Sequence, residues 1–337
     1  MSFHILSFGN ERRPPSAGRQ SSASERTTPR VIPLAWLFGV VAFSLAAVAT
    51  LMAWAGITVE APLWLGVLIG AAVGAFSAIG LWFRTPRSEN QRMWRDAAEY
   101  FGVFTSLCLI GAVAPYPLAV MSSGFADVPL ERVDQMLGFD WLAWYRFVAD
   151  RPAIQWLDRA AYESIYASPA LLLGYFAWTG RKIEARLFIF SFWAAATLTL
   201  VVFVFVPAKG PLALLWRGPL PYVPANALYQ AELIPSLRNN ALHRINLGEL
   251  QGLVSVPSFH AASALLFIIA AWPIRSLRWP IMIVNLAMLL ATPVEGTHYL
   301  IDIIAGAVVA LVAIMVSKAV SRDFAREQLG KQPCLTV

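Results

Sequence analysis

Two ionisable side chains lie at the start of an apolar segment near the C-terminus, where their types and spacing are suited to chemistry. His298 and Asp302 are four residues apart in a segment that begins at Val294 and stays apolar to about Val316. That is long enough to cross a bilayer, and residues four apart share one face of a helix. Ionisable groups at a membrane span are costly and usually functional. The alternative is a pair at a helix end that faces water, but a second polar cluster, Pro257-Ser258-Phe259-His260, opens another apolar segment and favours a function.

These residue types suit phosphoryl transfer. A neutral imidazole is a competent nucleophile toward phosphorus, or a general base, near neutral pH. Asp302 lies one helical turn from His298, where it could fix the tautomer of the ring and stabilise the imidazolium. His260 could protonate a departing alkoxide. Ser258 follows a proline at a helix start, where unpaired N–H groups and the helix dipole favour an anion. The set is consistent with a phosphohistidine intermediate.

The composition predicts an all-α protein that crosses the membrane several times. The chain has 337 residues, of which 58% are hydrophobic and only 14% charged, whereas a soluble domain is about half apolar and a quarter charged. The net charge of +6 is typical of basic cytoplasmic loops in a membrane protein. We expect no nucleic-acid partner, because no basic segment interleaved with aromatic residues is present.

We expect a helical bundle of eight spans preceded by a disordered tail, residues 1–30, which is rich in Ser, Arg and Pro. The fourth span begins with Asp158, Arg159 and Glu163, which indicates a polar face lining the bundle or a water-filled cleft. The expected spans are 33–55, 62–83, 101–121, 157–179, 185–206, 258–275, 279–294 and 297–317.

The distribution of Lys and Arg predicts the orientation of these spans. Most of them lie in the two terminal tails and in the second-to-third, fourth-to-fifth and sixth-to-seventh connections. By the positive-inside rule, both termini are cytoplasmic. The segments 122–156 and 207–257 then lie outside the membrane. We expect the first to form a short interfacial helix with an aromatic belt of Trp141, Trp144 and Tyr145, and the second to form a long structureless loop at the active site.

This topology brings the polar clusters to one face of the membrane. His260 begins the sixth span, and His298 and Asp302 begin the eighth, all on the external side. The external loop adds positive charges that could neutralise phosphate oxygens. Together with Ser258, the candidate phosphate-binding residues in the loop are Lys209, Arg238 and Arg244.

These motifs resemble the type-2 phosphatidic acid phosphatase superfamily. Pro257-Ser258-Phe259-His260 is similar to its P-S-G-H motif, and His298-x3-Asp302 is similar to its S-R-x5-H-x3-D motif. The segments 255–260, 297–306, 134–140 and 162–166 are most similar to the inositol phosphorylceramide synthase-like branch. The resemblance covers about residues 100–318 and leaves the first two spans outside.

The resemblance implies a role for each matching residue. His298 would be the nucleophile, Asp302 its orienting carboxylate, and His260 the acid for the leaving group and then the base for the acceptor. Ser258 would contact phosphate, and no metal or other cofactor would be needed. The sequence departs from the family where Phe259 replaces a glycine.

The positive charge of the site is where the sequence departs furthest from the family. Thr292 stands at the position of the phosphate-binding arginine, and Lys209 before Gly210 is only a candidate for the family's first motif. If the site holds a cation cradle, the loop must supply it, and the remaining loop candidates are Arg217, Arg238 and Arg244.

The sequence therefore predicts an integral membrane lipid phosphatase or phosphotransferase. Its partners would be the bilayer and a lipid phosphate or phospholipid substrate, and the synthase-like motifs favour headgroup transfer, as in an inositolphosphotransferase. Alternatives are a metal site of His260, His298, Asp302 and Glu295, a proton-coupled transporter, and a member that binds lipid phosphate without turnover. The oligomeric state is left open.

We expect the chain to divide into four parts. They are a cytoplasmic tail (1–30), two additional spans with a cytoplasmic loop (31–99), a six-span catalytic core (100–318) and a second cytoplasmic tail (319–337). The expected location is a bacterial inner membrane or cell membrane, with the active site on the external or periplasmic face.

Overall fold

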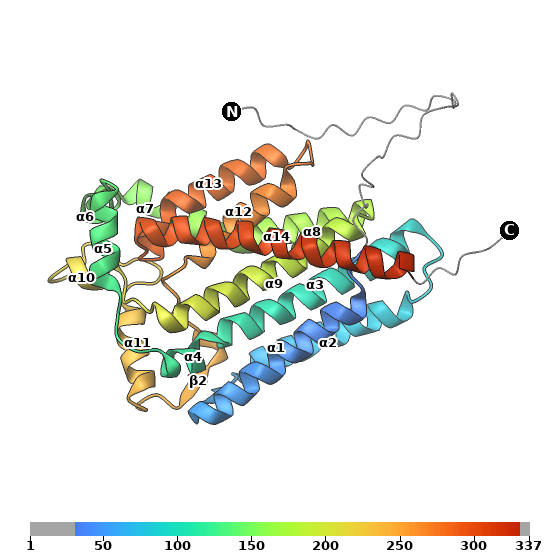
Figure 1. The fold of residues 1–337 in the computed structure, drawn as a ribbon, viewed down its shortest axis with the longest axis horizontal. Coiled ribbons are helices and arrows are strands. Elements are labelled where there is room, and N and C mark those ends of the chain that lie inside the picture. The colour runs from blue at the N-terminus through green and yellow to red at the C-terminus, as the bar shows by residue number, and fades with distance from the viewer. Residues whose placement is uncertain (1–30, 331–337) are drawn as a thin grey trace.

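The computed structural model describes the backbone of residues 31–330 and the side chains as far as residue 323. The long helices run side by side, and several short helices gather at one end of the bundle (Figure 1). The expected disordered tail, 1–30, lies outside the described residues, as do residues 331–337. The elements of the first half are α1 (Leu34–Ala55), β1 (Thr58–Glu60), α2 (Leu63–Trp82), α3 (Glu89–Val113), α4 (Pro115–Met121), α5 (Asp127–Met136), α6 (Trp141–Ala149), α7 (Pro152–Glu163), the 3-10 turn η1 (Ser164–Tyr166) and α8 (Ala167–Thr179).

The second half of the chain begins with a long helix and ends with another. Its elements are α9 (Lys182–Phe205), α10 (Pro211–Leu215), α11 (Tyr229–Arg238), β2 (Arg244–Asn246), η2 (Leu247–Glu249), α12 (Phe259–Ala271), α13 (Arg278–Glu295) and α14 (Leu300–Gly330).

The predicted all-α polytopic membrane bundle is confirmed. Within the described residues, five helices are long and apolar enough to cross a bilayer: α1, α2, the stretch Glu89–Met121, α9, and α14 as far as Asp323. The other three predicted spans correspond to shorter or interrupted helices. α12 has only 13 residues, and α13 has 18 residues with a charged residue at each end.

The predicted span 157–179 is two helices separated by a turn. α7 ends at Glu163, the 3-10 turn η1 follows, and α8 then continues to Thr179. Pro169 lies in the first turn of α8, and a proline cannot donate to the carbonyl four residues earlier. That carbonyl belongs to Ile165, inside η1. The helix is therefore interrupted where the proline removes one of its backbone hydrogen bonds.

The core is built around α9. This helix packs against α3, α12 and α14 and buries a row of aromatic and aliphatic side chains that includes Phe188, Ile189 and Phe192. Burial of such surface contributes roughly 25 cal/mol per Å². Because α9 holds both α12 and α14, the starts of these two helices are fixed relative to each other.

A close approach brings α14 against the first turn of α12. A Cβ atom at Gly306 would lie 2.3 Å from the backbone oxygen of Ser258 and 2.9 Å from the Cβ of Ala261. Only glycine leaves room for the two backbones here. This contact joins the two polar motifs that the sequence singled out.

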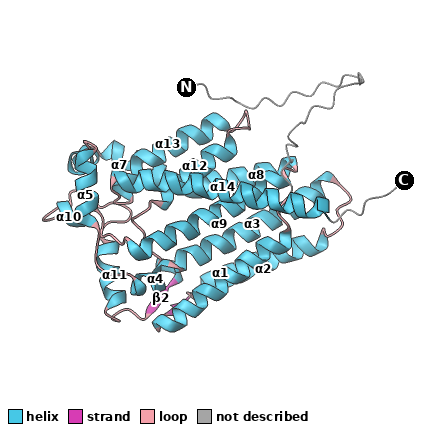
Figure 2. Cartoon of the chain, viewed as in Figure 1, coloured by secondary structure: helices cyan, strands magenta, loops and turns pink. Residues whose placement is uncertain are grey.

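The segment 207–257, predicted to be structureless, instead contains α10, α11, β2 and η2. α11 forms because it can bury Ile234 and Leu237 against the core. β2 pairs in parallel with β1, from the connection between α1 and α2, with Thr58 opposite Arg244 (Figure 2). Three-residue strands carry no periodic signal, so the sequence could not reveal this sheet.

The aromatic belt predicted for 141–145 is wrong for two of its three members. Trp141 is 1% exposed and Tyr145 is fully buried. The Trp141 indole donates to the Pro293 carbonyl at 2.8 Å, and the Tyr145 hydroxyl donates to the Tyr222 carbonyl at 2.6 Å. Trp141 thus fixes α6 to the end of α13 and Tyr145 fixes it to the segment before α11, because indole N–H and phenol O–H groups find a hydrogen-bond partner when they are buried.

We predict that Gly306→Ala destabilises the protein, whereas Gly174→Ala does not. The first methyl group would collide with the α12 backbone, and overpacking typically costs about 1–3 kcal/mol. Gly174 is also helical, and no neighbour lies within 4 Å of the position that a Cβ atom would take there, so its replacement should be neutral or slightly stabilising. Thermal unfolding of both variants in detergent tests this pair, and equal melting temperatures would contradict it.

Candidate active site

His298 lies in the turn that precedes α14 and is anchored to the end of α13. Its backbone N–H donates to the Pro293 carbonyl at 3.1 Å, and the preceding residue, Thr297, has a positive φ of 50°. The side chain of His298 is 2% exposed. The sequence placed His298 and Asp302 on one face of a continuous helix; the structure brings them together across a helix start.

The Asp302 carboxylate is the centre of a buried hydrogen-bond network. Its Oδ2 atom lies 3.4 Å from His298 Nδ1 and accepts from Ser255 Oγ and from the backbone N–H of Tyr299, both at 3.0 Å. These contacts on one oxygen fix the orientation of the carboxylate. If His298 Nδ1 donates to this oxygen, its proton is on Nδ1, and Nε2 retains the lone pair.

Gly296 makes room for the imidazole. A Cβ atom at Gly296 would lie 2.5 Å from His298 Cδ2 and 3.0 Å from His298 Nε2. The ring therefore packs against the backbone of Gly296, which limits the positions that Nε2 can take.

The second polar motif forms the start of α12. Ser258 is the N-cap residue, and its hydroxyl accepts from the N–H of Ala261 at 3.4 Å. Its backbone N–H donates to the Asp302 carbonyl at 3.0 Å, so the two motifs are hydrogen-bonded directly. The His260 ring stacks on Tyr162 with centroids 4.0 Å apart and an interplanar angle of 16°.

The segment that contains Lys209 is held beside the His298 turn. The Asp127 carboxylate accepts from the backbone N–H groups of Lys209 and Gly210 at 2.9–3.0 Å and from the Tyr299 hydroxyl at 3.0 Å. Gly210 has a φ of 92°, and a Cβ atom there would lie 2.7 Å from the Thr297 carbonyl. The Lys209 backbone is therefore fixed next to the candidate nucleophile.

Lys209 and Arg238 share one aromatic ring. Lys209 Nζ lies 4.6 Å from the centroid of the Phe125 ring, and Arg238 Cζ lies 4.5 Å from it. Arg238 also donates to the Ser122 hydroxyl at 2.8 Å and to the Gly124 carbonyl at 3.0 Å. Both cations thus lie around the connection between α4 and α5, where Arg238 is largely occupied by hydrogen bonds.

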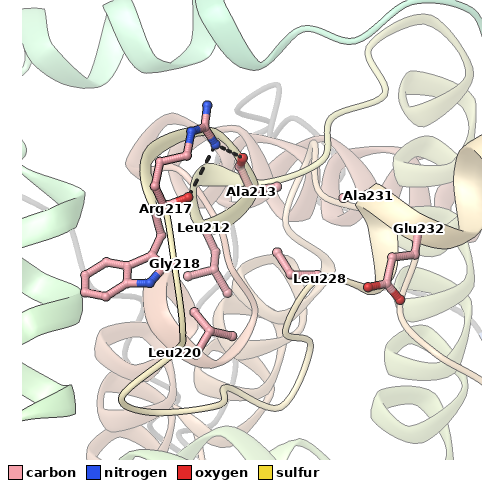
Figure 3. Close-up of a pocket in the computed structure, with 9 residues that line it drawn as sticks. Leu212, Ala213, Arg217, Gly218, Leu220, Leu228, Ala231 and Glu232 are labelled. Atoms are coloured by element: carbon pink, nitrogen blue, oxygen red, sulfur yellow. Dashed lines mark hydrogen bonds between the residues drawn. The ribbon is translucent and has the colours of Figure 1, made fainter.

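Two other loop arginines are placed away from this group. Arg244, in β2, pairs with Glu60 of β1 at 3.1 Å, and both side chains are exposed. The Arg217 guanidinium donates to the carbonyls of Ala213 and Trp216 at the edge of a cavity of 360 Å³ (Figure 3). We therefore leave Arg244 out of the site proposed below, although the sequence suggested it as a phosphate ligand.

The structure adds a carboxylate that the sequence left without a role. Asp134 in α5 accepts from the backbone N–H groups of Leu300 at 2.7 Å and Ile301 at 2.9 Å, and so caps α14. Burial raises the pKa of Asp134, while these two hydrogen bonds act in the opposite direction. No local signal marks Asp134 as a cap, because the helix it caps lies elsewhere in the chain.

An ion pair lies on the side of the site where α7 meets α13. Arg159 Nε is 3.0 Å from Glu295 Oε2, and Glu295 is fully buried. The Tyr222 hydroxyl also donates to Glu295. Burial, and next the neighbouring Glu295 carboxylate, raise the pKa of Tyr222, so this phenol stays protonated as a donor.

The described part of the chain offers no ligand set for the metal alternative. Among residues 31–323, no three His, Cys, Asp or Glu side chains converge closely enough to hold a metal ion. Glu295, which that alternative required, is instead engaged by Arg159 and Tyr222.

The fold and these residues define a polytopic membrane protein with a buried histidine–carboxylate pair at one end of the bundle. A comparison with known protein families matches residues 129–316 to the PAP2 superfamily. The match covers more than half of the chain, and the chain belongs to this superfamily. It is thereby an integral membrane enzyme of the lipid phosphatase and phosphotransferase type. No curated protein and no solved structure matched the chain.

We predict that Gly296→Ala reduces the turnover of a lipid phosphate by roughly 100-fold, because displacing a reacting group by about 1 Å can have that effect. The backbone of Gly296 is right-handed helical, a conformation that alanine adopts. The new methyl group would collide with the His298 ring and lie 2.9 Å from the Thr292 carbonyl oxygen. Turnover and melting temperature should be measured together, with Gly111→Ala, which has open space around it, as the control. Wild-type turnover in Gly296→Ala would show that the ring position is not critical.

Proposed function

We propose that this protein cleaves a lipid phosphate or a headgroup phosphodiester through a phosphohistidine on His298. The observation that carries the proposal is the buried contact between His298 Nδ1 and Asp302 Oδ2 at 3.4 Å. His260 lies two residues after Ser258, whose backbone N–H donates to the Asp302 carbonyl. A histidine whose Nδ1 proton is held by a carboxylate has a nucleophilic Nε2.

In the first half-reaction, His298 Nε2 attacks phosphorus, and the bond from phosphorus to the lipid oxygen breaks. His260 donates a proton to that departing oxygen, which leaves as an alcohol. A phosphate anion between the two rings favours the imidazolium form of His260 that this step requires. Ser258, at the start of α12, and Lys209, beside the His298 turn, would contact the phosphate oxygens. Arg238 would add positive charge from the same side as Lys209.

In the second half-reaction, an acceptor hydroxyl attacks the phosphohistidine and the N–P bond breaks. His260 takes the proton of the acceptor, and His298 is regenerated. Water as acceptor gives a phosphatase, and a lipid or polyol alcohol gives a transferase. The motifs around Ser258 and His298, which resemble the inositol phosphorylceramide synthase-like branch, favour transfer.

We further propose that the site faces the outside of the cell or the periplasm and that both termini are cytoplasmic. The site lies at the end of the bundle where α5, α7 and α10 gather (Figure 1). Lys182 and Arg186, at the start of α9, pair with Glu99 near the opposite end. An excess of basic residues marks the cytoplasmic side.

We predict that His298→Ala abolishes turnover without loss of fold and that Asp302→Asn lowers the rate by several orders of magnitude. The reason for the second effect is that an amide in place of the carboxylate favours the wrong imidazole tautomer. Phosphate release or exchange by purified protein in detergent is the measurement, with melting temperature as the check on folding. Substantial residual turnover in His298→Ala would remove this residue from the nucleophile role.

The covalent intermediate and the choice of acceptor can be tested with the wild-type protein. Labelled substrate followed by quenching should give an acid-labile, base-stable adduct that is absent from His298→Ala. The protein should also be incubated with a panel of lipid phosphates and phosphodiesters, and both the release of free phosphate and the exchange of the headgroup should be measured. A transferase should show headgroup exchange. Release of phosphate alone would identify a hydrolase, and binding without any turnover would identify a non-catalytic member.

A further inference from the structure

A phosphate group between the two histidines requires a nearby cation, and the residue at the usual position cannot supply it. Thr292 is fully buried, and its hydroxyl donates to the Met288 carbonyl within α13 at 2.7 Å. The loop cations Lys209 and Arg238 both lie on the Phe125 ring, on the α4–α5 side of the site. These two loop cations therefore lie around the α4–α5 connection, and a further cation on the α7 side of the site would complement them.

Arg159 in α7 is linked by contacts to both histidine segments. Its Nε atom is 3.0 Å from Glu295, which precedes His298 by three residues. One helical turn after Arg159, Tyr162 stacks on His260 with ring centroids 4.0 Å apart. α7 also packs along α13. Arg159 therefore contacts a residue that lies close to His298 in sequence and shares a helix with the residue that stacks on His260.

The guanidinium is held by the protein and remains accessible. Glu295 is fully buried and accepts from the Tyr222 hydroxyl and, at 2.9 Å, from the backbone N–H of Ala225. Arg159 Nη2 donates to the Val223 carbonyl at 3.1 Å. The Arg159 side chain is nevertheless 37% exposed. A buried carboxylate thus orients an arginine whose outer part can still contact a ligand.

We propose that Arg159 binds the phosphate group of the substrate in place of the arginine that is absent at Thr292, with Glu295 as its positioning residue. The inference rests on the proposed function of the histidines. A planar guanidinium can form two parallel hydrogen bonds to phosphate oxygens. On the same helix as Tyr162, which stacks on His260, Arg159 also stabilises the negative charge that develops on the phosphoryl oxygens during transfer.

The competing explanation is an ion pair that only stabilises the fold. In that case, removing Arg159 would leave the buried Glu295 carboxylate unpaired, which is strongly destabilising. Replacing both partners should then restore stability and function together. If Arg159 binds phosphate, the double replacement restores stability but not phosphate binding. The two explanations therefore differ in the double variant.

The test measures the rise in melting temperature that orthovanadate, a phosphate analogue, produces in the purified full-length protein. The variants are Arg159→Gln, Arg159→Lys, Glu295→Gln and the double variant Arg159→Gln/Glu295→Gln. We expect Arg159→Gln and the double variant to bind vanadate about 10- to 100-fold more weakly than wild type, as expected for the loss of a charged hydrogen bond. Arg159→Lys keeps the positive charge but loses the paired guanidinium donors, so its rise in melting temperature with vanadate should lie between those of wild type and Arg159→Gln. Glu295→Gln should retain part of the wild-type rise.

Arg217→Gln is the matched control, because Arg217 is an external arginine whose guanidinium donates only to backbone carbonyls of its own segment in the contacts shown in Figure 3. It should respond to vanadate like wild type. A wild-type response in Arg159→Gln, or its full return in the double variant, would overturn the assignment of Arg159.

Turnover separates failure of this inference from failure of the proposed function. With Arg159→Gln we expect kcat/KM for a lipid phosphate to fall by at least about 100-fold, as for the loss of one charge-stabilising donor. His298-dependent turnover at the wild-type kcat/KM in Arg159→Gln would reject the role of Arg159 and leave the mechanism standing. Absence of both turnover and vanadate binding in wild type would reject the proposed function itself.

Discussion

The arrangement of the site depends on one buried carboxylate. Asp302 is fully buried at the start of α14, where a polar group is tolerated only if hydrogen bonds replace its lost hydration. Its side chain accepts from the Ser255 hydroxyl and the Tyr299 N–H and lies 3.4 Å from His298 Nδ1, and its backbone carbonyl accepts from the Ser258 N–H. These contacts join the start of α12, the turn that contains His298, and the start of α14. The same hydrogen bonds that make the carboxylate tolerable thus orient the imidazole.

The same rule explains how the external segments are attached to the bundle. Asp127 is held by the N–H groups of Lys209 and Gly210 and by the Tyr299 hydroxyl, and Asp134 is held by the first N–H groups of α14. Each of these two acids of α5 therefore supplies acceptors to backbone donors that would otherwise be unpaired at a helix start or in a tight turn. Asp127 and Asp134 thus hold the backbone of the Lys209 segment and of the α14 start in place, next to the turn that contains His298.

The sequence was sufficient for features that are local. Apolar segments of span length predicted α1, α2, α9 and α14, and the motifs around Ser258 and His298 predicted which helix starts would meet. It was insufficient where a residue's role depends on a partner far away in the chain. Glu60 decides the placement of Arg244, and Phe125 attracts both Lys209 and Arg238. The buried positions of Trp141 and Tyr145 likewise depend on carbonyls of Pro293 and Tyr222, which no pattern within α6 reveals.

The first two helices contribute little to the core that holds the site. None of the residues of α2 is buried, and only three of α1 are, so most of their apolar surface is left to the lipid. The family match begins at residue 129, after both helices. The connection between them is hydrogen-bonded to the external segments through the β1–β2 pairing, the Thr58–His243 contact and the Arg244–Glu60 pair, which join it to the segment that leads into α12. We infer that α1 and α2 support the bundle from its lipid-facing side, because the donors around Asp302 all come from residues that follow the start of the family match.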